Sequence, residues 1–248
     1  ETTRVREVVH QPAGVVVAAK TTAETLRQIE TYLEEGYERV KVKIRPDNDY
    51  ALLSEIRRHF PTVPLIADAN AAYTREAVAQ LKKLDEFQLL MIEQPLAYDD
   101  IVEHMELQKQ LATPICLDES IGSVRDAKTA IALGCRVINV KLGRIGGWTA
   151  ALAIHELAKD RDVALWCGGM IEFGISRAHN IALASLETFS IPGDLSSSSR
   201  FWDEDLITPE VTVTSGYIAV PTRVGIGFSL NEKRLQDVLT HKERFLFT

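Results

Sequence analysis

Charged residues end five short apolar segments of this chain at a nearly constant spacing. The segments are RVKVK, LIAD, LLMIE, ICLD and RVINVK, which end at Lys43, Asp68, Glu93, Asp118 and Lys141. Three successive steps are 25 residues long and the fourth is 23. A step of this length is typical of one strand, one helix and their turns, so the spacing predicts a chain of repeated strand–helix units.

The apolar segments run without polar alternation, as parallel strands do when both faces of their sheet are covered. Amphipathic helical patterns lie between them. The first covers residues 22–36, with Leu26, Ile29 and Leu33 on one face and a stop at Gly36. Thr21, with Glu24 three residues later, predicts a capping box. We expect strands at 15–19, 39–44, 64–69, 89–94, 114–118, 137–142, 163–167 and 189–192.

Eight strand segments favour a closed barrel over an open sheet, and 248 residues is the usual size of one such barrel. We therefore predict an α/β fold of the TIM type, modified as (β/α)7β, over residues 1–205. Residues 206–248 contain β-like pieces and a terminal helix over 231–245. We expect them to form an extension that packs on the barrel and is not a separate domain.

Composition excludes several classes of protein. Hydrophobic residues make up 46% of the chain and charged residues 25%, as in a soluble globular protein. A net charge of −7 without a dense basic patch argues against nucleic acid and anionic membranes as partners. The longest apolar runs, such as residues 13–19, are too short to span a bilayer, and residues 1–11 lack the apolar stretch of a signal peptide.

The chain has three cysteines, Cys116, Cys135 and Cys167, each in or near an apolar strand segment. An odd number in such places predicts free, buried thiols and a location in the reducing cytoplasm. The sequence has no C-x-x-C pair and no H-E-x-x-H motif, which argues against a zinc site.

In a barrel of parallel strands, the carboxyl ends of all strands meet at one face. Asp68, Glu93 and Asp118 would then converge from three consecutive strands. Three crowded carboxylates repel one another, and a hard divalent cation removes that repulsion. Ligands that are all oxygen indicate one Mg²⁺, with Mn²⁺ as a substitute. The alternative is that these acids make ordinary ion pairs with Lys or Arg.

Lys43 and Lys141 end the strands on either side of the three acids. A lysine near a cation, partly removed from water, loses its proton more readily and can act as a base. Two such bases could remove and return a proton on opposite faces of one carbon atom. Lys41 points the same way as Lys43 because side chains alternate along a strand. It could favour proton loss from Lys43 or bind a substrate carboxylate.

The motifs KVK, DAN, IEQP, LDES and NVKLGRIGG together resemble the enolase superfamily, in its muconate-lactonizing branch. The segments WCGGMIEFGISRAHNIALASL and PGDLSSSSRFW resemble, more narrowly, the o-succinylbenzoate synthase and N-acylamino-acid racemase family. The resemblance covers most of the chain, from about Val15 to the C-terminus.

This resemblance implies roles for single residues and a reaction. Lys43 and Lys141 match the two bases, and Lys41 matches an electrostatic partner. The metal ligands match Asp68, Glu93 and Asp118, and the pocket lining matches Asn70, Gly168, Gly169 and Met170. The implied reaction removes the proton next to a substrate carboxylate through an enediolate intermediate that Mg²⁺ stabilises. Dehydration then yields o-succinylbenzoate for menaquinone synthesis, whereas reprotonation on the other face yields racemisation.

Members of this superfamily carry an N-terminal α+β capping domain that closes over the barrel mouth. This chain has about ten residues before its first expected strand, so we expect that domain to be absent from it. The alternative function is therefore a catalytically weak barrel or scaffold. Without the cap, the apolar residues Tyr217, Ile218, Val220 and Ile226 would lose their packing surface, and we expect self-association into a homo-oligomer.

Four other features have less specific interpretations. We expect Trp166 and Met170 to be core or pocket wall, and His179 to make a structural hydrogen bond. Gly168 and Gly169 could form a phosphate loop, but Asp194 close by disfavours an anion there. The resemblance adds that relatives acting on dipeptides carry two acids on the last strand. This chain has only Asp194, which disfavours dipeptides with a free amine.

Overall fold

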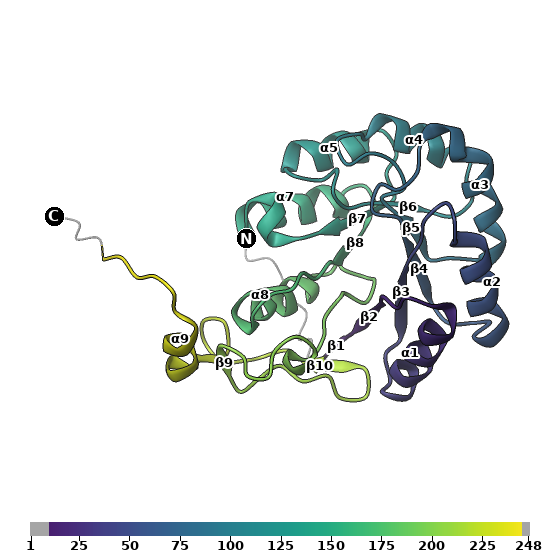
Figure 1. Ribbon diagram of the computed structural model, residues 1–248. Helices are drawn as coiled ribbons and strands as arrows, with labels where there is room; N and C mark the ends of the chain where they lie inside the picture. Colours follow the sequence, from purple (N-terminus) through teal and green to yellow (C-terminus); the bar gives the residue numbers. More distant parts are fainter. Residues whose placement is uncertain (1–9, 245–248) are drawn as a thin grey trace.

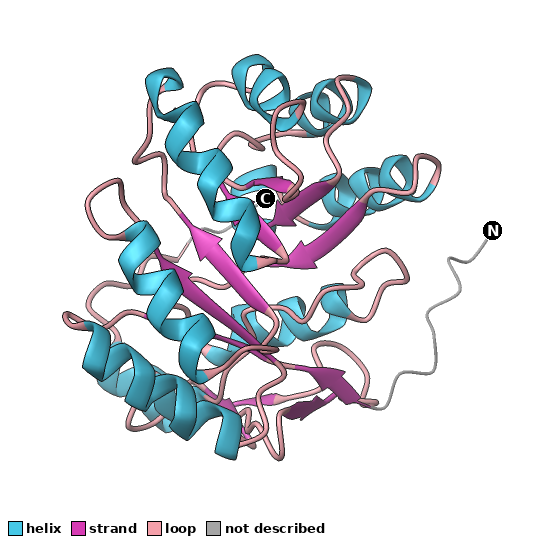
Figure 2. Cartoon of the chain, turned by 90° about the vertical axis from the view of Figure 1, so that its right-hand side faces the viewer, coloured by secondary structure: helices cyan, strands magenta, loops and turns pink. Residues whose placement is uncertain are grey.

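The computed structural model describes residues 10–244. Seven parallel strands form one curled sheet in the order β2-β3-β4-β5-β6-β7-β8, and helices surround it (Figures 1 and 2). The sheet strands are β2 (Gly14–Val17), β3 (Arg39–Lys43), β4 (Leu65–Asp68), β5 (Met91–Glu93), β6 (Ile115–Leu117), β7 (Val137–Val140) and β8 (Ala164–Cys167). This confirms the α/β fold of alternating strands and helices that the sequence predicts.

Helices connect successive strands on the outside of the sheet (Figure 1). The α-helices are α1 (Thr22–Glu34), α2 (Asp49–His59), α3 (Val78–Lys83), α4 (Val102–Gln108), α5 (Val124–Ala132), α6 (Leu142–Ile145), α7 (Trp148–Lys159) and α8 (Gly174–Ala184). Short 3-10 helices are η1 (Arg75–Ala77), η2 (Leu84–Phe87) and η3 (Ser198–Arg200). Helix α1 begins with the predicted capping box between Thr21 and Glu24, and Gly36 follows its end with a positive φ of 89°.

An irregular segment closes the ring in place of the eighth strand, so the prediction of a strand at 189–192 is wrong. Residues 188–194 instead make single backbone bridges to both edges of the sheet. On one side Leu165 N donates to Thr188 O and Asp194 N to Cys167 O. On the other side Gly14 N donates to Gly193 O at 2.7 Å. Pro192 and Gly193 interrupt the ladder, because proline has no N–H to donate.

Arg39 fastens this closing segment from inside the ring. Its guanidinium is fully buried, donates to Pro192 O, and forms an ion pair with Asp194 Oδ1 at 2.7 Å. It lies over the ring of Trp166, 5.2 Å from the ring centroid. A side chain at Gly14 has no room here, because a Cβ atom would lie 2.0 Å from Arg39 Nη2. Gly14 therefore makes the space in which Arg39 replaces part of the missing ladder.

Inside the ring, an apolar layer supports the charged strand ends. The layer consists of Ile66, Met91, Cys116, Val137 and Trp166, with Trp166 fully buried as predicted. Residues two positions further along a strand point the same way. The acids Asp68, Glu93 and Asp118 follow Ile66, Met91 and Cys116 at that distance, so they lie one level above the apolar layer. The larger hydrophobic cluster lies between the strands and the helices.

The C-terminal extension contributes to two small antiparallel ribbons, one of which it forms with a strand near the start of the chain. Strand β10 (Tyr217–Ala219) pairs with β1 (His10–Pro12), and β9 (Ile207–Thr208) pairs with β11 (Ser229–Leu230). Ile218 is 2% exposed and belongs to the main core, with Val220 packed against it. The expectation that these two residues have lost their packing surface is therefore wrong.

Helix α9 (Glu232–Val238) is shorter than the predicted helix over 231–245. Residues 239–244 are not helical, and residue 245 lies outside the described range. All three cysteines are free and buried, as predicted. Within residues 10–244, no helix has both the length and the hydropathy needed to cross a membrane.

The close approach of Gly14 to Arg39 gives a prediction for stability. We expect Gly14→Ala to lower the free energy of unfolding by about 3 kcal/mol, because the added methyl group must displace a buried, doubly anchored guanidinium. Denaturation in urea measures this change. Gly143→Ala is the control, because a Cβ atom there meets nothing within 4 Å. Equal effects of the two substitutions would contradict the proposed packing.

Candidate active site

The strand register brings the predicted charged residues together at one end of the barrel. Lys43, Asp68 and Glu93 are the last residues of β3, β4 and β5, and in the ladder Lys43 pairs with Asp68 and Asp68 with Glu93. Asp118 directly follows β6, and Lys141 directly follows β7. The strand ends therefore present three acids in a row, with one lysine on each side, as the sequence predicts.

Lys41 lies at the centre of this charged layer. Its ammonium group is 2.8 Å from Asp68 Oδ2, 2.7 Å from Glu93 Oε2 and 3.5 Å from Asp194 Oδ2. It also lies over the ring of Trp166, 4.9 Å from the ring centroid. Burial alone would lower the pKa of Lys41, but the three acids raise it well above its ordinary value. Lys41 is therefore a permanent buried cation.

Lys43 shares Asp68 with Lys41 but reaches the solvent. Its Nζ is 2.6 Å from Asp68 Oδ2 and also donates to Asn70 Oδ1, and its side chain is 43% exposed. Asn70 adopts a positive φ of 41° and donates its backbone N–H to Asp68 Oδ1. Burial alone would raise the pKa of Asp68, but Lys41 and Lys43 hold it below its ordinary value. Asp68 is therefore ionised between the two lysines.

Asp118 is held by two cations on the opposite side. Lys141 Nζ lies 2.8 Å from Asp118 Oδ2, and Arg144 Nη1 pairs with Asp118 Oδ1. The two halves of the site are thus alike. Each outer acid pairs with one of the two lysines predicted as bases and with a second cation.

Glu93, the middle acid, is the least compensated. It is fully buried; Asn139 Nδ2 donates to its Oε1 at 2.8 Å. Its Oε2 lies near Lys41 but accepts no well-directed hydrogen bond. Burial raises the pKa of Glu93 above its ordinary value, and Lys41 offsets this only in part. A buried carboxylate oxygen with an unmet acceptor is a position where a cation is favoured.

The donor chemistry of these acids, whose side chains offer only oxygen, fits a hard divalent cation. Within residues 10–244, no three Asp, Glu, His or Cys side chains are grouped as ready metal ligands. The oxygens of Asp68 and Asp118 instead face N–H donors and cations. Of the two lysines predicted as bases, the side chain of Lys43 is 43% exposed and that of Lys141 is 13% exposed. Among these three acids, Glu93 alone has a carboxylate oxygen, Oε2, that accepts no hydrogen bond.

A cavity of about 550 Å³ opens above the charged layer. Lys41, Lys43 and Lys141 line one part of it, and Met170 and Ile171 line its rim. Of the predicted pocket residues, Asn70, Gly169 and Met170 line this cavity, with Met170 59% exposed. Gly168 lines a neighbouring cavity of about 290 Å³ instead. It has no room for a side chain, because a Cβ atom would lie 2.2 Å from Asn139 Oδ1.

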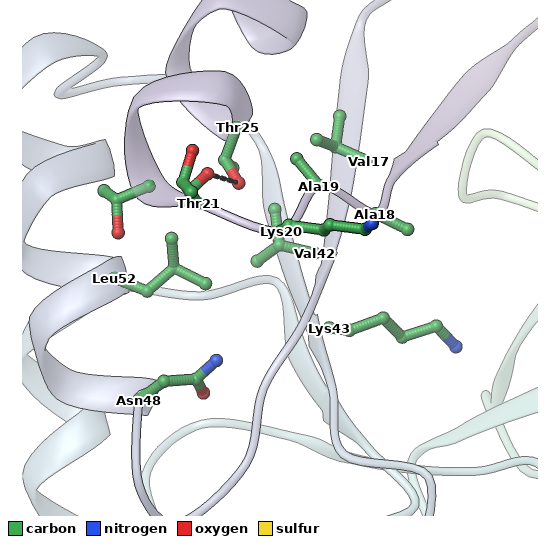
Figure 3. Close-up of a pocket in the computed structure, with 11 residues that line it drawn as sticks. Val17, Ala18, Ala19, Lys20, Thr21, Thr25, Val42, Lys43, Asn48 and Leu52 are labelled. Carbon is green, nitrogen blue, oxygen red and sulfur yellow. Dashed lines mark hydrogen bonds between the residues drawn. The ribbon is translucent and has the colours of Figure 1, made fainter.

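A second cavity, of about 240 Å³, lies beside Lys43 between β2, α1 and α2 (Figure 3). Thr25 Oγ1 donates to Thr21 O at its edge, and Lys43 extends away from Leu52 and Asn48. Aliphatic and threonine side chains line it together with Lys20, Lys43 and Asn48, and no acid is among them.

Sequence reasoning missed three groups of the site. Asn139 precedes Lys141 by two residues and therefore points to the same face, which the alternation of side chains could have shown. Arg144 follows Lys141 by one helical turn. The ion pairs of Asp194 with Arg39 and Lys41 depend on the irregular closing segment, and no local pattern predicts them. His179 accepts from Trp148 Nε1 at 3.0 Å, which confirms its structural role.

Comparison with known sequences relates the chain to the family described as enolase C-terminal domain-like, over residues 24–234. It is 52% identical over 235 residues to the o-succinylbenzoate synthase of Bacillus subtilis, covering 94% of this chain and 63% of that protein. It is 50% identical over 219 residues to the N-succinylamino acid racemase of Thermus thermophilus, covering 88% of this chain and 59% of that protein. The chain thus spans about three fifths of the length of these relatives.

Comparison with solved structures also relates the chain to the enolase superfamily. An enolase superfamily member from Listeria innocua superposes with a TM-score of 0.89 at 46% identity, covering 93% of this chain and 62% of that one. The muconate lactonizing enzyme from Pseudomonas putida superposes with a TM-score of 0.87 at 22% identity, covering 94% of this chain and 67% of that one. At the lower identity the likeness concerns the fold alone.

The position of Lys41 gives a prediction for the site. We expect Lys41→Met to lower the free energy of unfolding by about 3–5 kcal/mol, because it leaves buried carboxylates without their shared cation. Guanidinium denaturation measures the loss. Lys109→Met is the control, because Lys109 pairs with Glu106 on the exposed surface and little change is expected. A loss as small as that of the control would show that Lys41 does not neutralise the acids.

Proposed function

The chain belongs to the enolase superfamily, and from this premise we propose that it removes a proton next to a substrate carboxylate with the help of Mg²⁺. The observation that carries the proposal is the row of three acids at the strand ends with a lysine on each side. The substrate class is a small carboxylate with a succinyl group. The relatives named o-succinylbenzoate synthase and N-succinylamino acid racemase support that class.

We propose that Asp68, Glu93 and Asp118 hold the metal. A bound Mg²⁺ would supply positive charge to the substrate carboxylate and to the enediolate that forms when the proton leaves. Lys41 keeps part of the negative charge of Asp68 and Glu93 compensated throughout, because its own charge is permanent. Asn70 orients Lys43 through its side-chain oxygen.

Lys43 and Lys141 then act on opposite faces of the reacting carbon. Lys43 can leave Asp68 because Lys41 remains beside that carboxylate, and Lys141 can leave Asp118 because Arg144 remains. One lysine takes the proton from carbon. If the other donates a proton to a departing hydroxide, water leaves and a double bond forms. If it donates the proton to carbon on the other face, the substrate is racemised.

Both outcomes remain within the proposal, because both use the same two lysines. Formation of o-succinylbenzoate from succinyl-hydroxycyclohexadiene carboxylate, followed by absorbance, measures the first reaction. Loss of optical rotation of an N-succinylamino acid measures the second. Each assay is made with Mg²⁺ and with a chelator, and activity that persists in the chelator would count against the metal.

A catalytically weak barrel is the second candidate. The observation that favours it is the exposed apolar rim of the cavity, where Met170 is 59% and Ile171 75% exposed. Such a rim lets water reach the reacting groups and weakens their electrostatic effect on a substrate. The two assays above separate the candidates, since the second candidate binds Mg²⁺ but turns over neither substrate.

We further propose a cytoplasmic location, which the three free, buried cysteines support. Self-association also remains a proposal. Tyr217 on β10 is 39% exposed and Val224 beyond it is fully exposed, so this edge offers apolar surface to a second copy.

The metal site gives a prediction for binding. We expect Glu93→Gln to weaken Mg²⁺ affinity by tenfold or more in calorimetric titration, because an amide replaces the central buried carboxylate. Glu119→Gln is the matched control, since Glu119 lies in the same cavity but accepts from Asn70. Unchanged affinity in Glu93→Gln would exclude this ligand set.

The two bases give a prediction for proton exchange. In D₂O, we expect Lys43→Ala and Lys141→Ala each to slow α-proton exchange of one enantiomer of an N-succinylamino acid by about 10²–10⁴-fold. The enantiomer that each variant fails to exchange should differ, because the lysines face opposite sides. Lys20→Ala is the control at the adjacent cavity. Normal exchange of both enantiomers by both variants would refute the two-base scheme.

A further inference from the structure

Gln94, directly after the middle acid, connects the ends of two strands of the site. It is fully buried, and its side-chain oxygen accepts the backbone N–H groups of Asp118 at 2.9 Å and Ser120 at 3.2 Å. Its side-chain nitrogen donates to Ser120 Oγ at 2.7 Å and to Ala97 O at 3.1 Å. One amide group therefore joins the end of β5 to the turn that carries Asp118.

The backbone of Gln94 is shaped for this contact. Its φ is +41°, a left-handed backbone conformation that costs free energy for any residue other than glycine. Its own N–H donates to Cys116 O at 2.8 Å. Pro95 follows and fixes the direction in which the chain leaves the strand. The left-handed turn lies within the site itself, between Glu93 and the loop to α4.

A buried polar network holds the far side of the amide. Ser120 Oγ, which accepts from Gln94, donates to Asp100 O at 2.8 Å. His104 makes a hydrogen bond to the same carbonyl and accepts Leu96 N at 2.9 Å. Burial lowers the pKa of His104, so its imidazole is neutral and can accept this N–H. The network fixes the turn after β6 to helix α4.

Gln108 holds the other end of strand β6 in the way that Gln94 holds the end beside the acids. It is also buried, its side-chain oxygen accepts Ile115 N at 2.7 Å, and its nitrogen donates to Leu111 O and Thr113 O. Strand β6 is therefore held at both ends by a glutamine, one far from the acids and one beside them. Gln94 holds the end of β6 beside the acids, whereas Gln108 holds the end away from them. A comparison of variants at the two positions therefore separates a local effect on the site from a general loss of stability.

We propose that Gln94 is a positioning residue that sets the distance between Glu93 and Asp118. It fixes the main chain of Asp118 directly, whereas Lys141 and Arg144 hold the side chain of Asp118. A ligand set drawn from different strands needs such a fixed frame, because metal affinity depends on how well the surrounding contacts orient the ligands. The part of this inference that concerns the metal rests on the proposed function.

The experiment compares Gln94→Leu with Gln108→Leu. We expect similar losses of thermal stability, because each variant removes a buried amide and leaves backbone N–H groups unpaired. Site-resolved amide hydrogen exchange should show loss of protection at Asp118 and Ser120 in Gln94→Leu, and at Ile115 in Gln108→Leu. Calorimetric titration with Mg²⁺ should show a 10–100-fold weaker affinity for Gln94→Leu alone.

Ser120→Ala provides a milder variant if Gln94→Leu does not fold. It removes the hydroxyl that anchors the nitrogen of Gln94, and the Mg²⁺ affinity should fall less than in Gln94→Leu. Equal loss of affinity in Gln108→Leu, or unchanged protection of Asp118 in Gln94→Leu, would overturn the proposal. If the unaltered protein binds no Mg²⁺, the proposed metal site fails, and amide exchange alone still decides whether Gln94 holds Asp118.

Discussion

The buried ammonium group of Lys41 is the interaction on which the barrel end depends. It contacts carboxylates from β4, β5 and the closing segment, which no other side chain brings together within the described residues. The sequence RVKVK places Arg39, Lys41 and Lys43 on one face of β3 at three successive levels. Arg39 fastens the closing segment, Lys41 compensates the buried acids, and Lys43 reaches the cavity. One strand therefore serves closure and electrostatic balance, and it also supplies a lysine to the cavity.

Burying so many charges costs stability unless each has a partner, and here the pairing also prepares the chemistry. Burial raises the pKa of Glu93, whereas Lys41 and Lys43 outweigh the effect of burial on Asp68 and lower its pKa. Each outer acid pairs with two cations, so it keeps one charged partner if the other cation moves away. In the proposed reaction, this second cation would allow Lys43 and Lys141 to leave their carboxylates and act as bases.

The sequence predicted the layout of the site because side-chain alternation and a constant step determine which residues share a strand end. The register of Lys43, Asp68 and Glu93 follows from those two rules. The structure of the closing segment does not follow from them. Pro192 and Gly193 interrupt its apolar run, which pairs with the sheet only through single bridges. The burial of Ile218 was not predicted either, because β10 pairs with β1, which is far away in the sequence. Long-range pairing and ion pairs such as that of Asp194 with Arg39 carry no local pattern.

The charged residues of the site lie on strand ends, whereas the rim of the cavity lies on an exposed loop. The charged residues lie at strand ends above a fully buried apolar layer, so their positions are set by the sheet. Met170 and Ile171 lie on the loop after β8 and are largely exposed. A synthase and a racemase are similar to this chain to nearly the same degree, 52% and 50%, so identity over the barrel does not separate the two activities. In the proposed reaction, the strand ends would supply the proton chemistry common to both activities, and the way in which the rim orients the substrate would determine whether water is lost or the proton is returned.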